Sequence, residues 1–230
     1  MARVDIRGAI IPNDYKWFYD LFDMESTCPA DVKMVIDNLT TYEALDVYIN
    51  SGGGEIASGS EIYTMLRALG DRTRIHVTGE AHSAASIIAM AGWCEMAPTA
   101  LMMVHCVSSY ADGNHNDMEH AAEVLRTADR ALCSAYTAKT GMTEEEALAM
   151  MERETWLRAA DAKSLGLIDE IMFNGENDLV ISDSTFRLPT RDQMERARAM
   201  MERRDSDNDE KNKLQTQLNL LGLNARRLQK

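Results

Sequence analysis

Residues 77–92 read Val-Thr-Gly-Glu-Ala-His-Ser-Ala-Ala-Ser-Ile-Ile-Ala-Met-Ala-Gly, and this stretch decides how the rest of the chain is interpreted. A short β-branched run leads through a turn into a helix of small residues, with Ser83 at the helix start. Gly79 can adopt the backbone angles that a sharp strand-to-helix turn requires. The first amides of a helix have no partners within it, so they suit an oxyanion near Ser83. Ser83 is equally compatible with a plain N-cap, a common position for serine.

The segments before this stretch alternate between strand and helix patterns. Apolar runs predict strands over 3–11, 44–49 and 73–78, and helical periodicity predicts helices over 15–24, 29–39 and 56–69, with Ser26 and Thr27 opening the second helix. This alternation favours an α/β fold with a parallel-rich sheet and flanking helices.

A glycine-rich segment, Asn50–Glu55, follows the second predicted strand. We expect it to expose backbone amides at the carboxyl end of the sheet. It matches neither Gly-x-x-x-x-Gly-Lys-Ser/Thr nor Gly-x-Gly-x-x-Gly, the glycine patterns that bind nucleotide phosphates.

A histidine ends the next predicted strand, residues 100–104. His105 alone is compatible with a structural role, but a serine at a strand-to-helix turn makes it a candidate base. His82 directly precedes Ser83, and adjacent side chains generally point apart. We therefore expect His82 to line the site rather than to activate Ser83.

The second half of the chain is mostly helical. A long helix is predicted over 117–140, and its more than one apolar stripe is typical of a helix that packs against a neighbouring subunit. Helices over 143–151 and 160–164 follow, and 166–171 returns to the sheet. Composition changes after Phe173, so we assign 1–173 to the core domain and 174–230 to a polar linker and helical tail, as an interaction appendage or a flexible end.

Composition limits the classes of function. The 230 residues carry a formal net charge of −13, which argues against non-specific binding to nucleic acid or to anionic lipid. No apolar run is long enough to span a bilayer, so we expect a cytoplasmic protein. The four cysteines are widely spaced and are expected to be reduced thiols, and no pattern calls for a metal or a cofactor.

Several short segments, in this order, resemble the ClpP-type serine peptidases. They are Ile-Asn-Ser-Gly-Gly-Gly at 49–54, Gly-Glu-Ala-His-Ser-Ala-Ala at 79–85, Met-Met-Val-His at 102–105, Trp-Leu-Arg-Ala-Ala-Asp-Ala at 156–162 and Gly-Leu-Ile-Asp at 166–169. Each motif is short, but their shared order and spacing make the resemblance specific over about residues 3–173.

The resemblance implies the crotonase-like fold of that family, with a protruding helix, and peptidase activity without a cofactor. Ser83 then corresponds to the nucleophile and His105 to the general base that takes its proton. Gly53 and Ala84 correspond to the positions whose backbone amides bind the oxyanion.

The third member of the implied triad is an acidic residue. Glu154 occupies the position of the family's aspartate, counted back from Gly166, and a glutamate can orient an imidazole as an aspartate does. Glu152 is the alternative, whereas Asp169 is expected to be structural.

Two departures from the cellular enzymes indicate a particular branch of the family. Gly52 stands where those enzymes usually have proline, and the connection from Ser83 to His105 is shorter. Together with the segment Glu-Thr-Trp-Leu at 154–157 and the tail, they resemble the ClpP-related head maturation proteases of tailed phages and prophages. This resemblance implies an ATP-independent enzyme that processes capsid or scaffold protein in the host cytoplasm or prohead, as a homo-oligomeric ring of about six or seven subunits, single or double.

Three other readings remain open. The chain can be the proteolytic subunit of a cellular Clp enzyme that works with an ATPase. It can use a Ser/Lys pair, with Lys139 or Lys163 as the base. It can also be an inactive assembly or scaffold protein on the same fold, which the change from aspartate to glutamate at 154 would suit.

Overall fold

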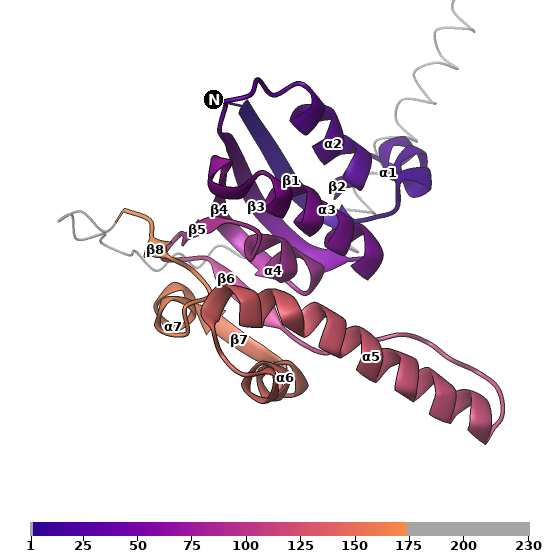
Figure 1. Ribbon diagram of the computed structural model, residues 1–230. Coiled ribbons are helices and arrows are strands. Elements are labelled where there is room, and N and C mark those ends of the chain that lie inside the picture. The colour runs from indigo at the N-terminus through magenta and orange to yellow at the C-terminus, as the bar shows by residue number, and fades with distance from the viewer. Residues whose placement is uncertain (1, 174–230) are drawn as a thin grey trace, which may run out of the picture. The chain divides into compact units, whose positions relative to one another are not determined.

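A mostly parallel sheet organises the structure, a computed structural model that describes residues 2–173 (Figure 1). Within these residues the strand order is β2-β1-β3-β4-β5-β8, with β6 beside β4 and β7 beside β6, and only the pair β6–β7 is antiparallel. The strands are β1 (Ala2–Ile10), β2 (Ser26–Thr27), β3 (Leu45–Gly54), β4 (Thr73–His82), β5 (Trp93–Met96), β6 (Leu101–Val104), β7 (Thr155–Arg158) and β8 (Glu170–Ile171).

Helices connect the strands and cover the apolar face of the sheet. They are α1 (Lys16–Leu21), α2 (Pro29–Asp37), α3 (Ile56–Ala68), α4 (Ala84–Ala89), α5 (His115–Thr140), α6 (Glu144–Glu152) and α7 (Ala159–Ser164), with short 3-10 turns at Asn13–Tyr15 and Gly70–Arg72. Helix α2 packs on β1, and α4 packs on β3 and β4. The predicted α/β fold with a parallel-rich sheet and flanking helices is therefore confirmed.

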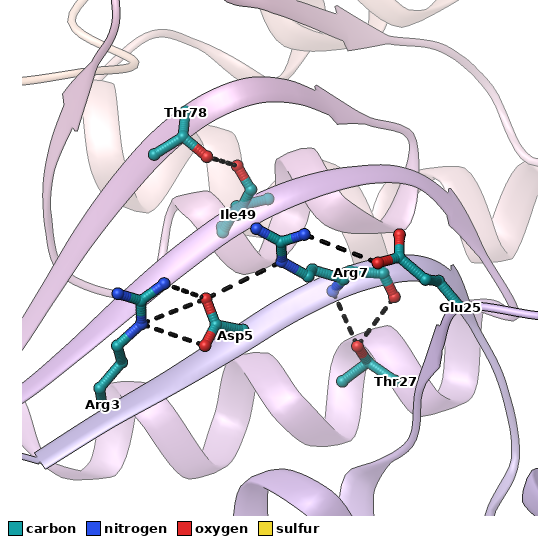
Figure 2. Close-up of polar contacts among 7 residues, drawn as sticks. All are labelled: Arg3, Asp5, Arg7, Glu25, Thr27, Ile49 and Thr78. Atoms are coloured by element: carbon teal, nitrogen blue, oxygen red, sulfur yellow. Dashed lines mark hydrogen bonds and ion pairs between the residues drawn. The ribbon is translucent and has the colours of Figure 1, made fainter.

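Alternation along the strands separates an apolar face from a polar one. Leu45, Val47 and Ile49 of β3 are fully buried, whereas the residues between them are only partly buried. On β1 the polar face carries a row of ion pairs that links Arg3, Asp5, Arg7 and Glu25 (Figure 2). The helices thus cover the apolar face of the sheet, because burying that face gives a larger hydrophobic stabilisation than burying the polar face would.

Strand β4 has two different neighbours on the same side. Its first half pairs with β5, from Arg74↔Trp93 to Val77↔Met96, and its last residues pair with β6, from Glu80↔Leu101 to His82↔Met103. Strand β6 therefore ends beside the end of β4. Because both strands run parallel, the residues that follow them emerge at the same edge of the sheet.

The long helix α5 begins and ends with strong signals. Asn114 and Asp117 form a capping box at its start, and Gly141 ends it in the left-handed conformation with φ 76°. Its buried residues, from Asp129 to Tyr136, all lie in the C-terminal half. The N-terminal half projects from the sheet and its helices (Figure 1), as the predicted protruding helix does.

Two boundaries near the N-terminus differ from the sequence prediction. Ser26 and Thr27 do not open a helix: they form strand β2, which pairs with β1, and Cys28 is the N-cap of α2. The cause is visible in Figure 2, where the Thr27 hydroxyl accepts from the Arg7 amide at 2.8 Å and donates to the Arg7 carbonyl at 3.0 Å. Helix α1 is also shorter than predicted.

The two glycine positions near the site also differ from the prediction. The glycines 52–54 are not a loop: they belong to β3, and Gly53 and Gly54 pair with Ala9 and Ile10 of β1. Gly79 does not form the turn, because β4 continues to His82. A Cβ at Gly79 would lie 2.2 Å from the Asn50 side-chain oxygen, so this glycine is required for close approach.

The remaining expectations concern the cysteines, a membrane-spanning helix and the C-terminal tail. All four cysteines are free thiols, as predicted. In the described range, none of the helices is long and apolar enough to cross a membrane. The tail predicted over 174–230 lies outside the described residues, and the domain boundary at residue 173 stays a prediction.

Candidate active site

Ser83 forms the turn between β4 and α4 with a strained backbone. Its φ of 54° and ψ of −124° are rare for a residue with a side chain and are tolerated only where neighbouring groups hold them. The Ser83 amide donates to the Met103 carbonyl at 2.9 Å, and its own carbonyl accepts from the Ser86 amide at 2.9 Å. A strained strand-to-helix turn of this kind presents a serine hydroxyl at the edge of a sheet.

The Ser83 hydroxyl does not cap the helix. No side-chain capping bond joins it to the first turn of α4, so the plain N-cap reading is wrong. Ser83 Oγ lies instead 2.8 Å from His105 Nε2. The structure therefore brings together the two residues that the sequence singled out as nucleophile and base.

His105 follows β6 directly, and its position results from the pairing of β6 with β4. The chain just beyond it is fixed by Asp129 of α5, whose Oδ1 accepts from the Val107 amide at 2.7 Å. Only 8% of Asp129 is exposed. A buried carboxylate requires hydrogen bonds, and here it ties the segment after the histidine to the long helix.

The backbone N–H groups of the two predicted oxyanion positions, Gly53 and Ala84, differ in their hydrogen bonding. A Cβ at Gly53 would lie 2.7 Å from the Ser83 Cβ, so Gly53 packs directly against the serine turn. Its N–H, however, donates to Ser51 Oγ at 3.1 Å. Ala84 is the first residue of α4, and an amide at this position has no partner within its helix.

Glu154 and His105 each stand next to the last residue pair of β6 and β7. The two strands pair as far as Val104↔Thr155, and the Glu154 amide donates to the Met151 carbonyl at 3.0 Å. The Glu154 backbone is left-handed, with φ 49°, and its Oε1 accepts from Trp156 Nε1 at 3.2 Å. No hydrogen bond joins the carboxylate to His105 among the described residues.

Of the alternative residues, Asp169 and Lys139 are bonded to each other. Asp169 accepts from the Cys94 amide at 2.7 Å and from the Lys139 ammonium, which also donates to the Gly92 carbonyl at 2.8 Å. These contacts tie the end of α5 to the sheet and leave Lys139 bonded away from Ser83. For Lys163, at the end of α7, no contact with Ser83 is present in residues 2–173, and Glu152 is an exposed residue at the end of α6.

Within residues 2–173, neither His76 nor His82 makes a hydrogen bond to Ser83 Oγ. His82 packs edge-on against Trp156 at 4.8 Å between ring centroids, and its Nδ1 lies 3.5 Å from Glu80. The expectation that His82 lines the site stays a prediction. His76 lies between Glu95 and Asp46 on the polar face of the sheet. In the described part of the chain, no cluster of three His, Cys, Asp or Glu is arranged to hold a metal ion.

A small cavity of about 60 Å³ opens beside Ser83 and His105. Its lining is both polar and apolar and comes from β3, α3, α4, α5 and α6 together with the turn at Ser83 and the segment from His105 onward. The lining residues are Gly54, Ile56, Ser83, Ala84, Ile87, His105, Val107, Ser108, Leu132, Tyr136 and Met151. The cavity has room for a few water molecules or a small apolar side chain.

Sequence reasoning missed Asp129, Ser86 and Tyr136. Asp129 stands four residues after Leu125 and four before Cys133, on an apolar stripe of the predicted long helix, and an acid at such a position was a usable signal. The hydroxyl groups of Ser86 and Tyr136 lie 2.7 Å apart. These residues are fifty positions apart in the sequence, and no local pattern connects them.

Comparison with known proteins gives a family for this chain. A family model described as Clp protease matches residues 31–175, more than half of the chain. The matched span includes Ser83, His105 and Glu154. The parallel-strand sheet with flanking helices is consistent with the ClpP fold.

Cys106 directly follows His105, and the reactivity of its thiol tests the electrostatics around that histidine. Burial, followed by the charge of Asp129, raises the pKa of Cys106 to about 11. Alkylation of Cys106 by iodoacetamide, measured by peptide mass spectrometry, should therefore rise about tenfold per pH unit between pH 7 and pH 10. Asp129→Asn should lower this pKa and accelerate alkylation at pH 8, and the control Glu152→Gln should accelerate it less. A rate that is flat above pH 8 in the unmodified protein would contradict this.

Proposed function

The chain belongs to the Clp protease family, and we propose that it is a serine endopeptidase that cuts polypeptides with Ser83 as nucleophile and His105 as base. The observation that carries this proposal is the 2.8 Å distance between Ser83 Oγ and His105 Nε2 at the edge of the sheet. Proteins of this family act on polypeptide substrates and form ring oligomers.

The proposed reaction proceeds through an acyl-enzyme. With its ring proton on Nδ1, His105 accepts the Ser83 proton at Nε2 while Oγ bonds to the substrate carbonyl carbon. The tetrahedral intermediate collapses as the histidine gives that proton to the leaving amine. Water then loses a proton to His105 and attacks the ester carbon. The second tetrahedral intermediate collapses as His105 gives that proton to Ser83 Oγ, which leaves the carbon and releases the acid product.

The amide of Ala84 is the better supported oxyanion donor. It begins α4 directly after the nucleophile, where helix amides lack internal partners and point toward developing negative charge. We assign Gly53 as the second donor because it packs against the serine turn. This role requires its N–H to turn from Ser51 toward the substrate oxygen.

Glu154 is proposed as the acid that orients His105. The support for this role is its position in the chain, because β7 pairs with β6 as far as Val104↔Thr155, and Glu154 and His105 are the residues next to that last pair. The role requires the Glu154 side chain to turn from Trp156 toward the imidazole.

The pocket and the sheet edge suggest how a peptide is bound. Strand β3 pairs with β4 as far as Ser51↔Ala81, whereas Gly53 and Gly54 pair only with β1. We propose that an extended peptide adds as a strand on the side of these glycines where β4 no longer pairs, with the Gly53 N–H turning from Ser51 Oγ toward the peptide. The cavity of about 60 Å³ then limits the substrate side chain beside Ser83 to a small one.

We propose processing of capsid or scaffold protein during phage head maturation as the biological role. The sequence features that support it are Gly52, the short connection from Ser83 to His105 and the segment at 154–157. The projecting half of α5 carries Met118 and Val124 exposed, and we assign it to contacts between subunits of a ring of about six or seven. This role places the protein in the host cytoplasm and prohead.

The nucleophile is tested by labelling with a fluorophosphonate. The unmodified protein should carry one adduct on Ser83, and Ser83→Ala should carry none. His105→Ala should hydrolyse peptides at least about a thousandfold more slowly, because the base is lost. The exposed serine variant Ser60→Ala is the matched control and should label normally. Absence of label on Ser83 in the assembled protein would contradict the peptidase, and normal turnover by His105→Ala would favour a lysine base.

The acid is tested by a pair of amide substitutions. Glu154→Gln should lower kcat about a hundredfold or more, because a neutral amide neither holds the required tautomer nor stabilises the imidazolium. Glu152→Gln is the matched control, since it removes a nearby charge of the same kind, and should change kcat little. Equal losses in both variants, or a loss in Glu152→Gln alone, would remove Glu154 from the triad.

Independence from an unfoldase is tested with an unstructured protein substrate such as casein. The purified protein should degrade it without ATP or a second protein, and addition of a Clp ATPase should not accelerate the reaction. Ser83→Ala provides the background rate. Digestion that requires the ATPase would instead identify a cellular proteolytic subunit.

A further inference from the structure

A pair of buried hydroxyl groups lies directly behind the nucleophile. Ser86 Oγ is 2.6 Å from the Ser83 carbonyl oxygen and 2.7 Å from the Tyr136 hydroxyl. Ser86 is fully buried and 1% of Tyr136 is exposed. The chain of contacts therefore runs from α5 through α4 to the backbone of the serine turn.

The number of protons fixes the direction of these bonds. A serine hydroxyl has one proton, and Ser86 donates it to the Ser83 carbonyl. Tyr136 must then donate to Ser86 Oγ for both bonds to form. Burial raises the pKa of the Tyr136 phenol, which therefore stays protonated and remains a donor at every working pH.

The peptide bond between Ser83 and Ala84 joins this chain of contacts to the chemistry. A peptide unit is planar, so its carbonyl oxygen and its N–H point in opposite directions. Holding the Ser83 carbonyl therefore sets the direction of the Ala84 N–H, the proposed oxyanion donor. Donation to the carbonyl also polarises the same peptide unit, because hydrogen bonds in a chain strengthen one another.

We propose that Tyr136 and Ser86 are positioning residues that hold the Ser83–Ala84 peptide plane, and with it the oxyanion donor, in the orientation that catalysis requires. This inference rests on the proposed function of Ser83. The strained backbone of Ser83 makes the requirement specific, because a turn with φ 54° keeps its orientation only when its polar groups are held. Neither residue contacts the reacting atoms through its hydroxyl.

The experiment measures kcat and KM for peptide hydrolysis in Tyr136→Phe, Ser86→Ala and the double variant. Each single variant should lower kcat about three- to tenfold, the range of one neutral hydrogen bond, with KM unchanged. Phenylalanine keeps the ring that lines the cavity, so substrate binding is preserved. The affinity for a peptide boronate, whose tetrahedral adduct places an oxygen near the Ala84 amide, should fall by the same factor.

The double variant tests whether Tyr136 acts on catalysis through Ser86 or through its own packing. Because Tyr136 acts only through Ser86, the double variant should lose no more kcat than Ser86→Ala alone. Tyr63→Phe is the matched control, a partly buried tyrosine of α3 whose variant should keep the unmodified kcat. All variants are compared after gel filtration has shown the same assembly as the unmodified protein.

Two results would overturn the inference. If the unmodified protein is active, Ser83→Ala is inactive and both single variants keep full kcat, the hydroxyl pair has no positioning role, although the proposed function stands. A double variant whose losses multiply would equally exclude a single chain of action. If the unmodified protein is no more active than Ser83→Ala, the proposed function itself fails, and this inference fails with it.

Discussion

The left-handed backbone of Ser83 is the constraint on which the rest of the site depends. A residue with a side chain adopts φ 54° and ψ −124° only where the surrounding structure fixes it, and here its amide is bonded to β6 and its carbonyl to α4. This conformation turns the hydroxyl away from the helix amides and toward His105. A relaxed turn would let the same hydroxyl cap the helix, as serine commonly does.

The sheet and the long helix supply what this constraint requires. The change of partner along β4, from β5 to β6, ends two parallel strands side by side and places Met103 against the Ser83 amide. Helix α5 then reaches both halves of the site. Its Asp129 holds the segment after His105, and its Tyr136 reaches the segment after Ser83 through Ser86. The helix therefore supports both the segment that follows Ser83 and the segment that follows His105.

The sequence predicted the parts of the site that local patterns encode. Serine at a strand-to-helix junction and histidine at a strand end are both readable in sequence, and the structure brings Ser83 and His105 together. Gly79 was misread as the turn because its requirement is tertiary: the Asn50 side chain approaches it from another strand. The glycines of β3 were misread for a similar reason, since their pairing with β1 is not visible locally. The contact between Ser86 and Tyr136 forms only because α4 packs against α5, and this packing cannot be read from the sequence of either helix alone.

The central claim, that the turn at Ser83 presents an activated nucleophile beside an oxyanion site, is tested most directly by a crystal structure of the fluorophosphonate adduct. The account predicts a phosphorus atom bonded to Ser83 Oγ, with the phosphoryl oxygen accepting from the Ala84 amide and from Gly53 N–H turned away from Ser51. An unmodified Ser83, or an adduct whose phosphoryl oxygen contacts neither amide, would contradict it.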